Sequence, residues 1–137
     1  MAQDFVGSNN INVLVPSGQF GTRCAGGSDH ASARYIQTYI TPQITRTIYK
    51  MEDDAILNYL DDDGQEIEPE WFIPVLPMIL VNGAKGIGTG FSTTVPKYSP
   101  KEIAENLIAM IDNKVSDIVE LKPWYKDFKG SIISANK

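Results

Sequence analysis

The chain has 137 residues, of which 42% are hydrophobic, and its 12 basic and 17 acidic residues give a formal net charge of −5. This length allows one domain or two small ones. A single cysteine, Cys24, excludes an internal disulfide and a cysteine-based metal site. The longest apolar stretch, Trp71 to Val81, is too short to cross a bilayer, so we expect no membrane partner.

The acidic residues are concentrated in one part of the sequence. Net acidity alone argues against nucleic acid, because proteins that bind DNA usually present a basic surface. Residues 1–50, however, carry four basic side chains against two acidic ones, whereas residues 51–70 carry nine acids and no base. We therefore expect residues 51–70 to face away from any phosphate backbone.

The first half of the chain predicts a strand, a loop and a broken helix. Alternating apolar residues over 11–15 predict a strand that ends at Pro16. The glycine-rich segment 18–27 predicts a loop. From Ala31 onward a helical pattern begins, because isoleucines recur every four residues, at Ile36, Ile40, Ile44 and Ile48. A break with Thr41 as N-cap and Pro42 at the first helical position fits this pattern better than one straight helix.

The middle of the chain predicts a short helix over 54–60 and a turn over 61–64. The apolar stretch 71–81 predicts a buried segment, in which prolines forbid a regular helix. A second glycine-rich loop is predicted over 82–90.

One further helix is predicted to begin at residue 99. Ser99 is the expected N-cap, Pro100 the first helical residue, and Glu102 the partner that would close a capping box. We place a domain boundary near Ile67, between the acidic segment and the proline-rich apolar stretch.

The segment from Gly18 to Tyr35 carries the first candidate chemistry. A glycine-rich loop lets the backbone approach a polyanion, and Arg23 and Arg34 can each bind phosphate oxygens with two N–H groups. The tyrosine hydroxyl is a poor nucleophile unless a cation or a base helps it, and Arg34 stands directly before Tyr35. An Arg–Tyr pair is nevertheless common, so from these residues alone a core or surface role for Tyr35 stays open.

The second candidate is the segment from Asn82 to Gly90. It lacks the ending of a P-loop and the spacing of a dinucleotide fingerprint, so it is weak as a nucleotide site. An isoleucine among glycines, Ile87, is unusual as a packing element but suits an apolar wedge that enters a base step and bends DNA.

No metal site is predicted. One histidine, His30, and Cys24 cannot complete a ligand set, and we interpret both as structural or peripheral. The acidic run 61–64 lacks the remaining ligands of a calcium loop.

Four stretches, in this order, resemble the breakage–reunion region of eukaryotic-type (type IIA) DNA topoisomerase II. They are AQDFVGSNNINVLVPSGQFGTR at 2–23, SARYI at 32–36, EPEWFIPVLPMILVNGAKGIGTGFST at 68–93 and FKGSI at 128–132. The resemblance covers essentially the whole chain, and it extends more distantly to bacterial gyrase A subunits around Arg34–Tyr35 and the loop 82–90. It implies an α+β fold, with the C-terminal part of a winged-helix domain at 1–67 and the start of the tower domain, which carries a DNA-bending loop, at 68–137.

The resemblance also implies a role for each candidate residue. Tyr35 would attack a DNA phosphate and form a 5′-phosphotyrosyl link, and Arg34 would stabilise charge on the transferring phosphoryl group. Ile87 would be the wedge, and Arg23 would contact the DNA backbone. Two positions depart from the family. Many members have Lys where this chain has Ser28, and Glu where it has Lys85, which suggests that one DNA contact compensates for the other.

Partners and cofactors follow from the same resemblance. It implies double-stranded DNA as substrate, a homodimer of the full-length enzyme, and ATP and Mg²⁺ bound by domains whose motifs this sequence does not contain. The chain would then be one segment of a larger polypeptide, and we expect no DNA cleavage from it alone. The expected location is the nucleus, or the host cytoplasm or virion if the source is a large DNA virus.

Two other interpretations stay open at the level of sequence. The chain could be a DNA-binding or scaffold module that keeps the fold without the reaction, although such a module has no need for both Arg34 and Tyr35. It could also be a nucleotide-binding domain built on the loop 82–90, which would bind ATP saturably.

Overall fold

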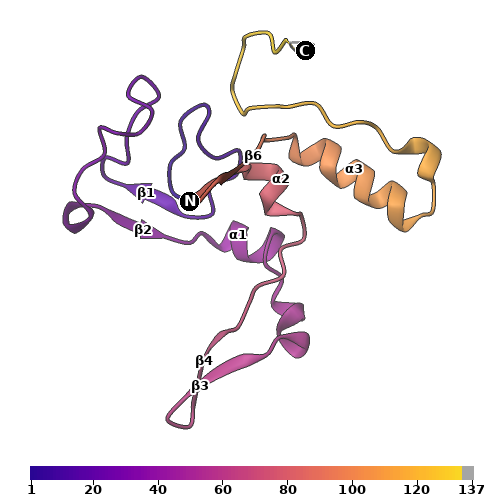
Figure 1. Cartoon of the computed structure of the whole chain (residues 1–137). Coiled ribbons are helices and arrows are strands. Elements are labelled where there is room, and N and C mark those ends of the chain that lie inside the picture. Colours follow the sequence, from indigo (N-terminus) through magenta and orange to yellow (C-terminus); the bar gives the residue numbers. More distant parts are fainter. Residues whose placement is uncertain (134–137) are drawn as a thin grey trace. The chain divides into compact units, whose positions relative to one another are not determined.

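A computed structural model describes residues 1–133, and it shows an α+β chain in two compact units (Figure 1). Unit 1 comprises Met1–Tyr39 and Leu76–Lys137, and unit 2 comprises Ile40–Val75. These bounds differ from the division at Ile67, and the assignment of 1–67 to a winged-helix domain and 68–137 to a tower domain stays a prediction.

Unit 1 contains a short antiparallel pair, β1 (Val15–Ser17) and β2 (Gln37–Tyr39), with Val15 opposite Tyr39. The predicted strand over 11–15 is wrong in its bounds, because β1 begins at Val15 and includes Pro16. Both strands of a two-stranded sheet are edges, so Pro16 can turn the side that lacks an N–H group away from the ladder.

The helix predicted from Ala31 does not form before residue 42. A single 3-10 turn forms at Ala33–Tyr35. Only Ile36, which is extended with φ −124°, separates this turn from β2. Pairing with β1 therefore overrides the four-residue spacing of isoleucines, a common outcome when tertiary contacts oppose a local pattern.

The second part of unit 1 begins with helix α2 (Met78–Asn82) and a hairpin made of β5 (Ala84–Gly88) and β6 (Phe91–Val95). The prediction of a loop over 82–90 is wrong, since every residue from Ala84 to Gly88 pairs with β6. At Gly83, where the chain leaves α2, φ is 68° and a Cβ would lie 2.6 Å from the carbonyl oxygen of Val95. Only glycine fits this approach.

Helix α3 (Pro100–Ile111) starts where the sequence predicts, with Ser99 as N-cap and proline at its first position. The prediction of a capping box is wrong, because the Ser99 side chain makes no capping hydrogen bond. The helix buries Ile103 and Ala109, and a 3-10 turn at Val115–Asp117 follows it.

The predicted burial of the apolar stretch 71–81 is wrong for several of its large side chains, and most of its other residues are only half-buried. Trp71, Phe72 and Ile79 are each more than half exposed, whereas Val81 is fully buried. The prolines at 74 and 77 keep the segment from forming a regular element until α2 begins, and α2 buries only Val81.

Unit 2 holds α1 (Pro42–Thr47), a 3-10 helix (Met51–Ile56) and a hairpin of β3 (Tyr59–Asp62) and β4 (Gln65–Pro69). The helix start at Thr41–Pro42 is confirmed. The turn predicted over 61–64 is confirmed at Asp63 and Gly64, which both have positive φ, as a two-residue Asp-Gly hairpin turn requires, but residues 61 and 62 belong to β3.

The helix predicted over 54–60 is wrong in unit 2. The 3-10 helix ends at Ile56, and Tyr59 and Leu60 already belong to β3. The hydroxyl of Tyr59 donates a hydrogen bond of 3.0 Å to Asp54, and this bond raises the pKa of Tyr59.

Asn10 is the buried polar centre of unit 1. Its amide nitrogen lies 2.9 Å from the carbonyl oxygen of Val81, 3.1 Å from that of Tyr98 and 3.2 Å from that of Trp124. Its side-chain oxygen accepts from the backbone N–H of Lys126 at 2.9 Å. One side chain, only 5% exposed, thus joins the N-terminal segment to three parts of the chain far away in sequence.

Replacing Asn10 by Ala should lower the free energy of unfolding by about 3 kcal/mol, because several buried backbone groups would lose their partners. Urea unfolding of the full chain, followed by tryptophan fluorescence, measures this change. The control is Asn12→Ala, which removes one local bond to the carbonyl of Leu14 and should cost about 1 kcal/mol. Equal losses for the two variants would contradict the central role of Asn10.

Candidate nucleic-acid interface

Tyr35 ends the 3-10 turn Ala33–Tyr35, where its backbone N–H donates to the carbonyl of Ser32 at 2.9 Å. Its side chain is 74% exposed, which is high for an aromatic residue. The guanidinium carbon of Arg34 lies 5.8 Å from the centre of the Tyr35 ring, so a cation covers the ring face. The structure therefore places together the two residues that the sequence singled out for chemistry.

The Tyr35 hydroxyl has no hydrogen bond to another side chain or backbone group within residues 1–133. Among these residues, no carboxylate or imidazole is therefore hydrogen-bonded to the Tyr35 hydroxyl. The arrangement offers an accessible phenol next to a fixed positive charge, which suits attack on an anionic group.

The loop before this turn is held by its own hydrogen bonds. The Thr22 hydroxyl donates to Asp29 at 2.7 Å, and the Thr22 N–H donates to the same carboxylate at 2.8 Å. These two bonds lower the pKa of Asp29 below its ordinary value of 3.8, the hydroxyl having the larger effect. Gly21 is required here, because φ is +103° and a Cβ would lie 2.5 Å from the Cα of Gly27. The glycine-rich segment is a loop, as predicted.

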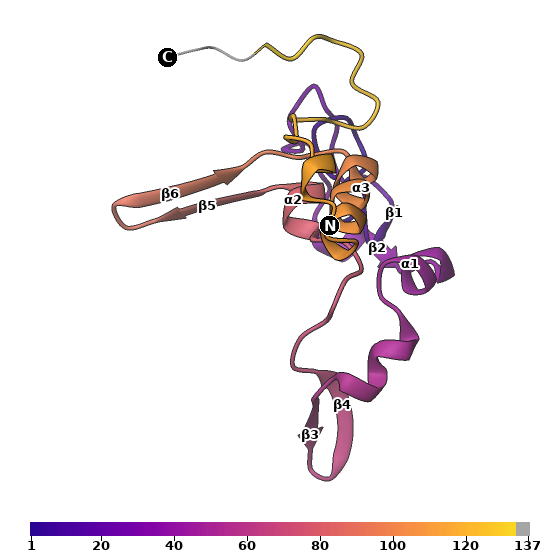
Figure 2. The same ribbon diagram turned by 90° about the vertical axis from the view of Figure 1, so that its right-hand side faces the viewer.

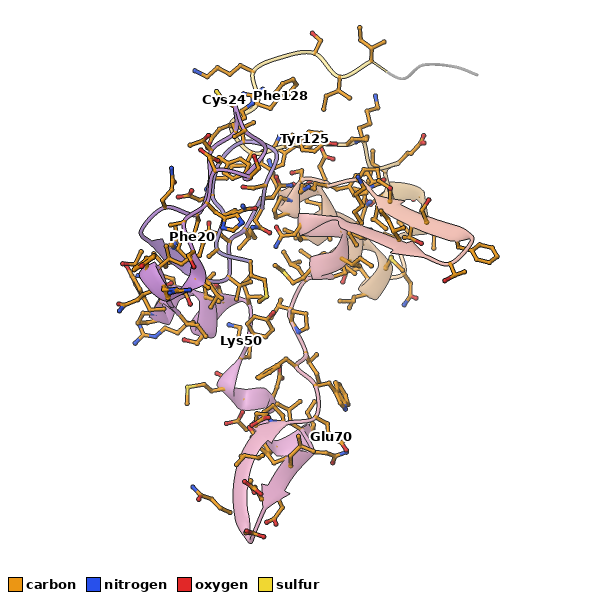
Figure 3. The ribbon with its side chains drawn as sticks, turned by 60° about the vertical axis from the view of Figure 1, so that its left-hand side comes forward. Phe20, Cys24, Lys50, Glu70, Tyr125 and Phe128 are labelled. Carbon is orange, nitrogen blue, oxygen red and sulfur yellow. The ribbon has the colours of Figure 1, made fainter. Side chains whose placement is uncertain are left out.

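Arg23 and Ser28 both lie on this loop and are exposed. The guanidinium of Arg23 stands 5.8 Å above the ring of Phe128, which in turn packs edge-to-face on Tyr125. Figure 3 shows Phe128 beside Cys24, the residue after Arg23. No pattern in the sequence predicts this contact, because its members lie at opposite ends of the chain. The Ser28 hydroxyl donates to the carbonyl of Ala25 at 2.8 Å and so stabilises the loop.

Lys85 and Ile87 lie on β5, in the hairpin that extends beyond α2 in unit 1 (Figure 2). Ile87 is 83% exposed, and Phe91, at the start of β6, is 86% exposed. Alternate residues of a strand point to one face, so Lys85 and Ile87 share a face. An apolar side chain is thus presented on a thin element, but on a paired hairpin rather than an irregular loop.

Two further findings concern a metal-ion site and a membrane-spanning helix. Among residues 1–133, no three His, Cys, Asp or Glu side chains come together in a way that could hold a metal ion. Within the same residues no helix combines the length and apolar character needed to cross a membrane.

Comparison with known proteins identifies the family. The family model that describes the A subunits of DNA gyrase/topoisomerase IV matches residues 1–137. The chain belongs to this family of type IIA DNA topoisomerases. It is 54% identical over 132 residues to DNA topoisomerase 2 of Arabidopsis thaliana and 56% identical over 130 residues to that of Drosophila melanogaster, which covers 96% and 95% of this chain. These matches confirm the eukaryotic-type resemblance.

A solved structure agrees with the sequence comparison. The DNA-binding, cleavage and re-ligation domain of Plasmodium falciparum topoisomerase II is similar to this chain, with a TM-score of 0.85 and 52% identity. The match covers 99% of this chain and 18% of that one, and it confirms the α+β fold class. The chain spans only 9% of the length of each of the two curated topoisomerases named above.

The stability of the loop that contains Thr22 and Asp29 should depend on pH, because the Asp29 carboxylate accepts two hydrogen bonds from Thr22. Since the folded pKa is lowered, the stabilisation from the two Thr22 bonds is present above pH 3.8 and is lost as pH falls through the lowered pKa. An NMR titration of the Asp29 carboxyl, with the Thr22 amide as reporter, measures this. Thr22→Val should return the pKa of Asp29 toward 3.8, and in Asp29→Asn the acid transition of the Thr22 amide should disappear. A wild-type Asp29 that titrates at 3.8 would contradict the hydrogen-bonded loop.

Proposed function

We propose that this chain is the tyrosine-bearing segment of an ATP-dependent DNA topoisomerase II. The enzyme makes a transient double-strand break, passes a second duplex through it and reseals the first. Two protomers act together, and each cuts one strand. The observation that carries the proposal is the exposed turn in which Arg34 stands over the ring of Tyr35.

The cleavage step is a phosphoryl transfer. The Tyr35 oxygen attacks a DNA phosphorus and gives its proton to solvent, the bond from phosphorus to the 3′ oxygen breaks, and this leaving oxygen takes up a proton. The products are a 5′-phosphotyrosyl link and a free 3′-hydroxyl, which attacks the same phosphorus to reseal the strand. Arg34 can stabilise the charge on the phosphoryl oxygens, since a guanidinium donates two parallel N–H bonds to such a group.

DNA contacts surround this step. Arg23 binds the DNA backbone, and Ile87 enters a base step and bends the duplex, at a cost of about a few kcal/mol for unstacking. The exposure of Ile87 on a hairpin supports this role. Lys85, on the same face, adds a phosphate contact. This contact compensates for the one that is lost at Ser28, where many relatives have lysine.

Mg²⁺ and ATP are cofactors of the proposed enzyme as a whole. Among residues 1–133 no three His, Cys, Asp or Glu side chains come together to hold a metal ion, so we propose that other parts of the enzyme bind Mg²⁺. The proposed location is the nucleus, or the host cytoplasm or virion for a viral enzyme. The scaffold alternative predicts DNA binding without cleavage, and the retained Arg34–Tyr35 pair speaks against it.

Tyr35→Phe should abolish covalent cleavage in the intact enzyme that carries this chain, because the phenyl ring has no attacking oxygen. Supercoiled plasmid is incubated with enzyme and Mg²⁺, then treated with SDS and protease. The wild type should give protein-linked linear DNA, and the variant none.

Two outcomes would count against this assignment. Linear product from Tyr35→Phe would place the nucleophile elsewhere, and no cleavage by the wild type would favour the scaffold. Arg34→Lys is the matched variant for the cation, since it keeps the charge but loses the two-pronged contact. It should slow cleavage about a hundredfold without weakening DNA binding to the same extent.

Lys85→Glu should weaken DNA binding and make it less dependent on salt. Loss of one phosphate contact should lower the slope of log K against log salt by about one. Fluorescence anisotropy of a labelled duplex, at several salt concentrations, measures the slope. The control is Lys114→Glu, the same charge change at an exposed residue that pairs with Asp112. An unchanged slope for Lys85→Glu would rule out the contact and the compensation for Ser28.

A further inference from the structure

The register of the β5–β6 hairpin sorts its side chains onto two faces. Lys85 pairs with Thr94, and Ile87 pairs with Ser92. Residues directly opposite each other in an antiparallel pair point to the same side, and alternate residues of one strand do so as well. These four side chains therefore share one face, which we call the Ile87 face.

The opposite face is chemically different. It carries the other three pairs of the hairpin, in which Ala84 stands opposite Val95, Gly86 opposite Thr93 and Gly88 opposite Phe91. Neither glycine has positive φ. A Cβ at Gly86 would meet nothing within 4 Å, and one at Gly88 would meet only the carbonyl oxygen of Phe91, at 3.8 Å. The fold does not require glycine at either position. Because Gly86 and Gly88 have no side chains, however, the hairpin is thin at the two residues next to Ile87.

The Ile87 face presents groups that can bind the phosphates of a DNA backbone. Around the apolar wedge it presents one ammonium group, from Lys85, and two hydroxyls, from Ser92 and Thr94. All four residues are exposed, and within residues 1–133 neither hydroxyl makes a hydrogen bond. Hydroxyl and ammonium groups are common partners of phosphate oxygens in complexes with DNA.

The charge of the surrounding sequence favours the same partner. Residues 71–101 contain three lysines, Lys85, Lys97 and Lys101, and no acidic residue. Although the chain as a whole is acidic, the charged side chains of this stretch are all positive and are complementary to a polyanion. A thin two-stranded ribbon also fits within a groove of duplex DNA.

We propose that Ser92 and Thr94 bind the phosphates of the duplex that Ile87 enters, so that the Ile87 face is the DNA-binding face of the hairpin. This inference rests on the proposed function and extends it to two residues that position the wedge. Thr93 and Phe91, on the opposite face, do not touch that duplex.

Neighbouring threonines on opposite faces provide a matched test. Thr94→Val and Thr93→Val each replace a hydroxyl by a methyl group of nearly the same shape. Each is made in the intact enzyme with Tyr35→Phe, so that binding is measured without cleavage. Anisotropy of a labelled duplex gives Kd over a range of salt, and energy transfer between dyes at the two duplex ends reports bending.

Thr94→Val should raise Kd about threefold to tenfold and reduce bending, because one hydrogen bond to phosphate is lost. The salt slope should stay unchanged, since the hydroxyl is neutral. Ser92→Ala should behave in the same way. Thr93→Val should leave both Kd and bending as they are, and all variants should melt at the same temperature.

Other outcomes separate the two proposals. Equal effects of Thr93→Val and Thr94→Val, or no effect of Thr94→Val and Ser92→Ala, would overturn the face assignment while the proposed function stands. Loss of DNA affinity on Phe91→Ala would show that the duplex lies on the opposite face. Absence of duplex binding before any hairpin substitution would overturn the proposed function together with this inference.

Discussion

The arrangement of segments in unit 1 depends on the hydrogen bonds of the Asn10 side-chain amide. This amide binds the carbonyl oxygens of Val81, just before the β5–β6 hairpin, and of Tyr98, just after it. Asn82 adds a reciprocal pair with the backbone of Ile11, at 2.9 and 2.8 Å. Two asparagines thus fasten the base of the hairpin to the N-terminal segment. Buried backbone groups must find partners, and here side-chain amides supply them where no continuous sheet does.

The same N-terminal segment also holds the loop that leads to Tyr35. The side-chain nitrogen of Gln3 donates to the carbonyl of Phe20 at 2.8 Å, and it would lie 2.5 Å from a Cβ at Gly27, where φ is +87°. The hairpin that carries Ile87 and the loop that leads to Tyr35 are therefore both linked to residues 1–11. Few apolar side chains are fully buried in the described part of unit 1, so positional accuracy at both places depends on polar contacts, which have strict distance and angle requirements.

Local chemistry predicted some elements of this chain and misled at others. Thr41–Pro42, Ser99–Pro100 and the Asp63–Gly64 turn act through the backbone angles of their own residues, so the sequence shows them directly. The helix expected from Ala31 and the loop expected over 82–90 failed because strand pairing with distant or following residues decided the outcome. The pairing of Arg34 with Tyr35 was visible as a dipeptide, but the contact of Arg23 with Phe128 arises only on folding.

Charge explains how an acidic chain can present a surface for DNA. Unit 2 holds nine acidic side chains against Arg46 and Lys50, whereas the rest of the sequence holds ten basic and eight acidic ones. The net negative charge therefore belongs to unit 2, and every candidate DNA contact lies in unit 1. At the salt concentration of a cell, charges more than about 8 Å apart in solvent are largely screened from each other. The charged neighbour of Tyr35 is Arg34, and the charged side chain on the Ile87 face is Lys85, so the charge beside each of these residues within unit 1 is positive.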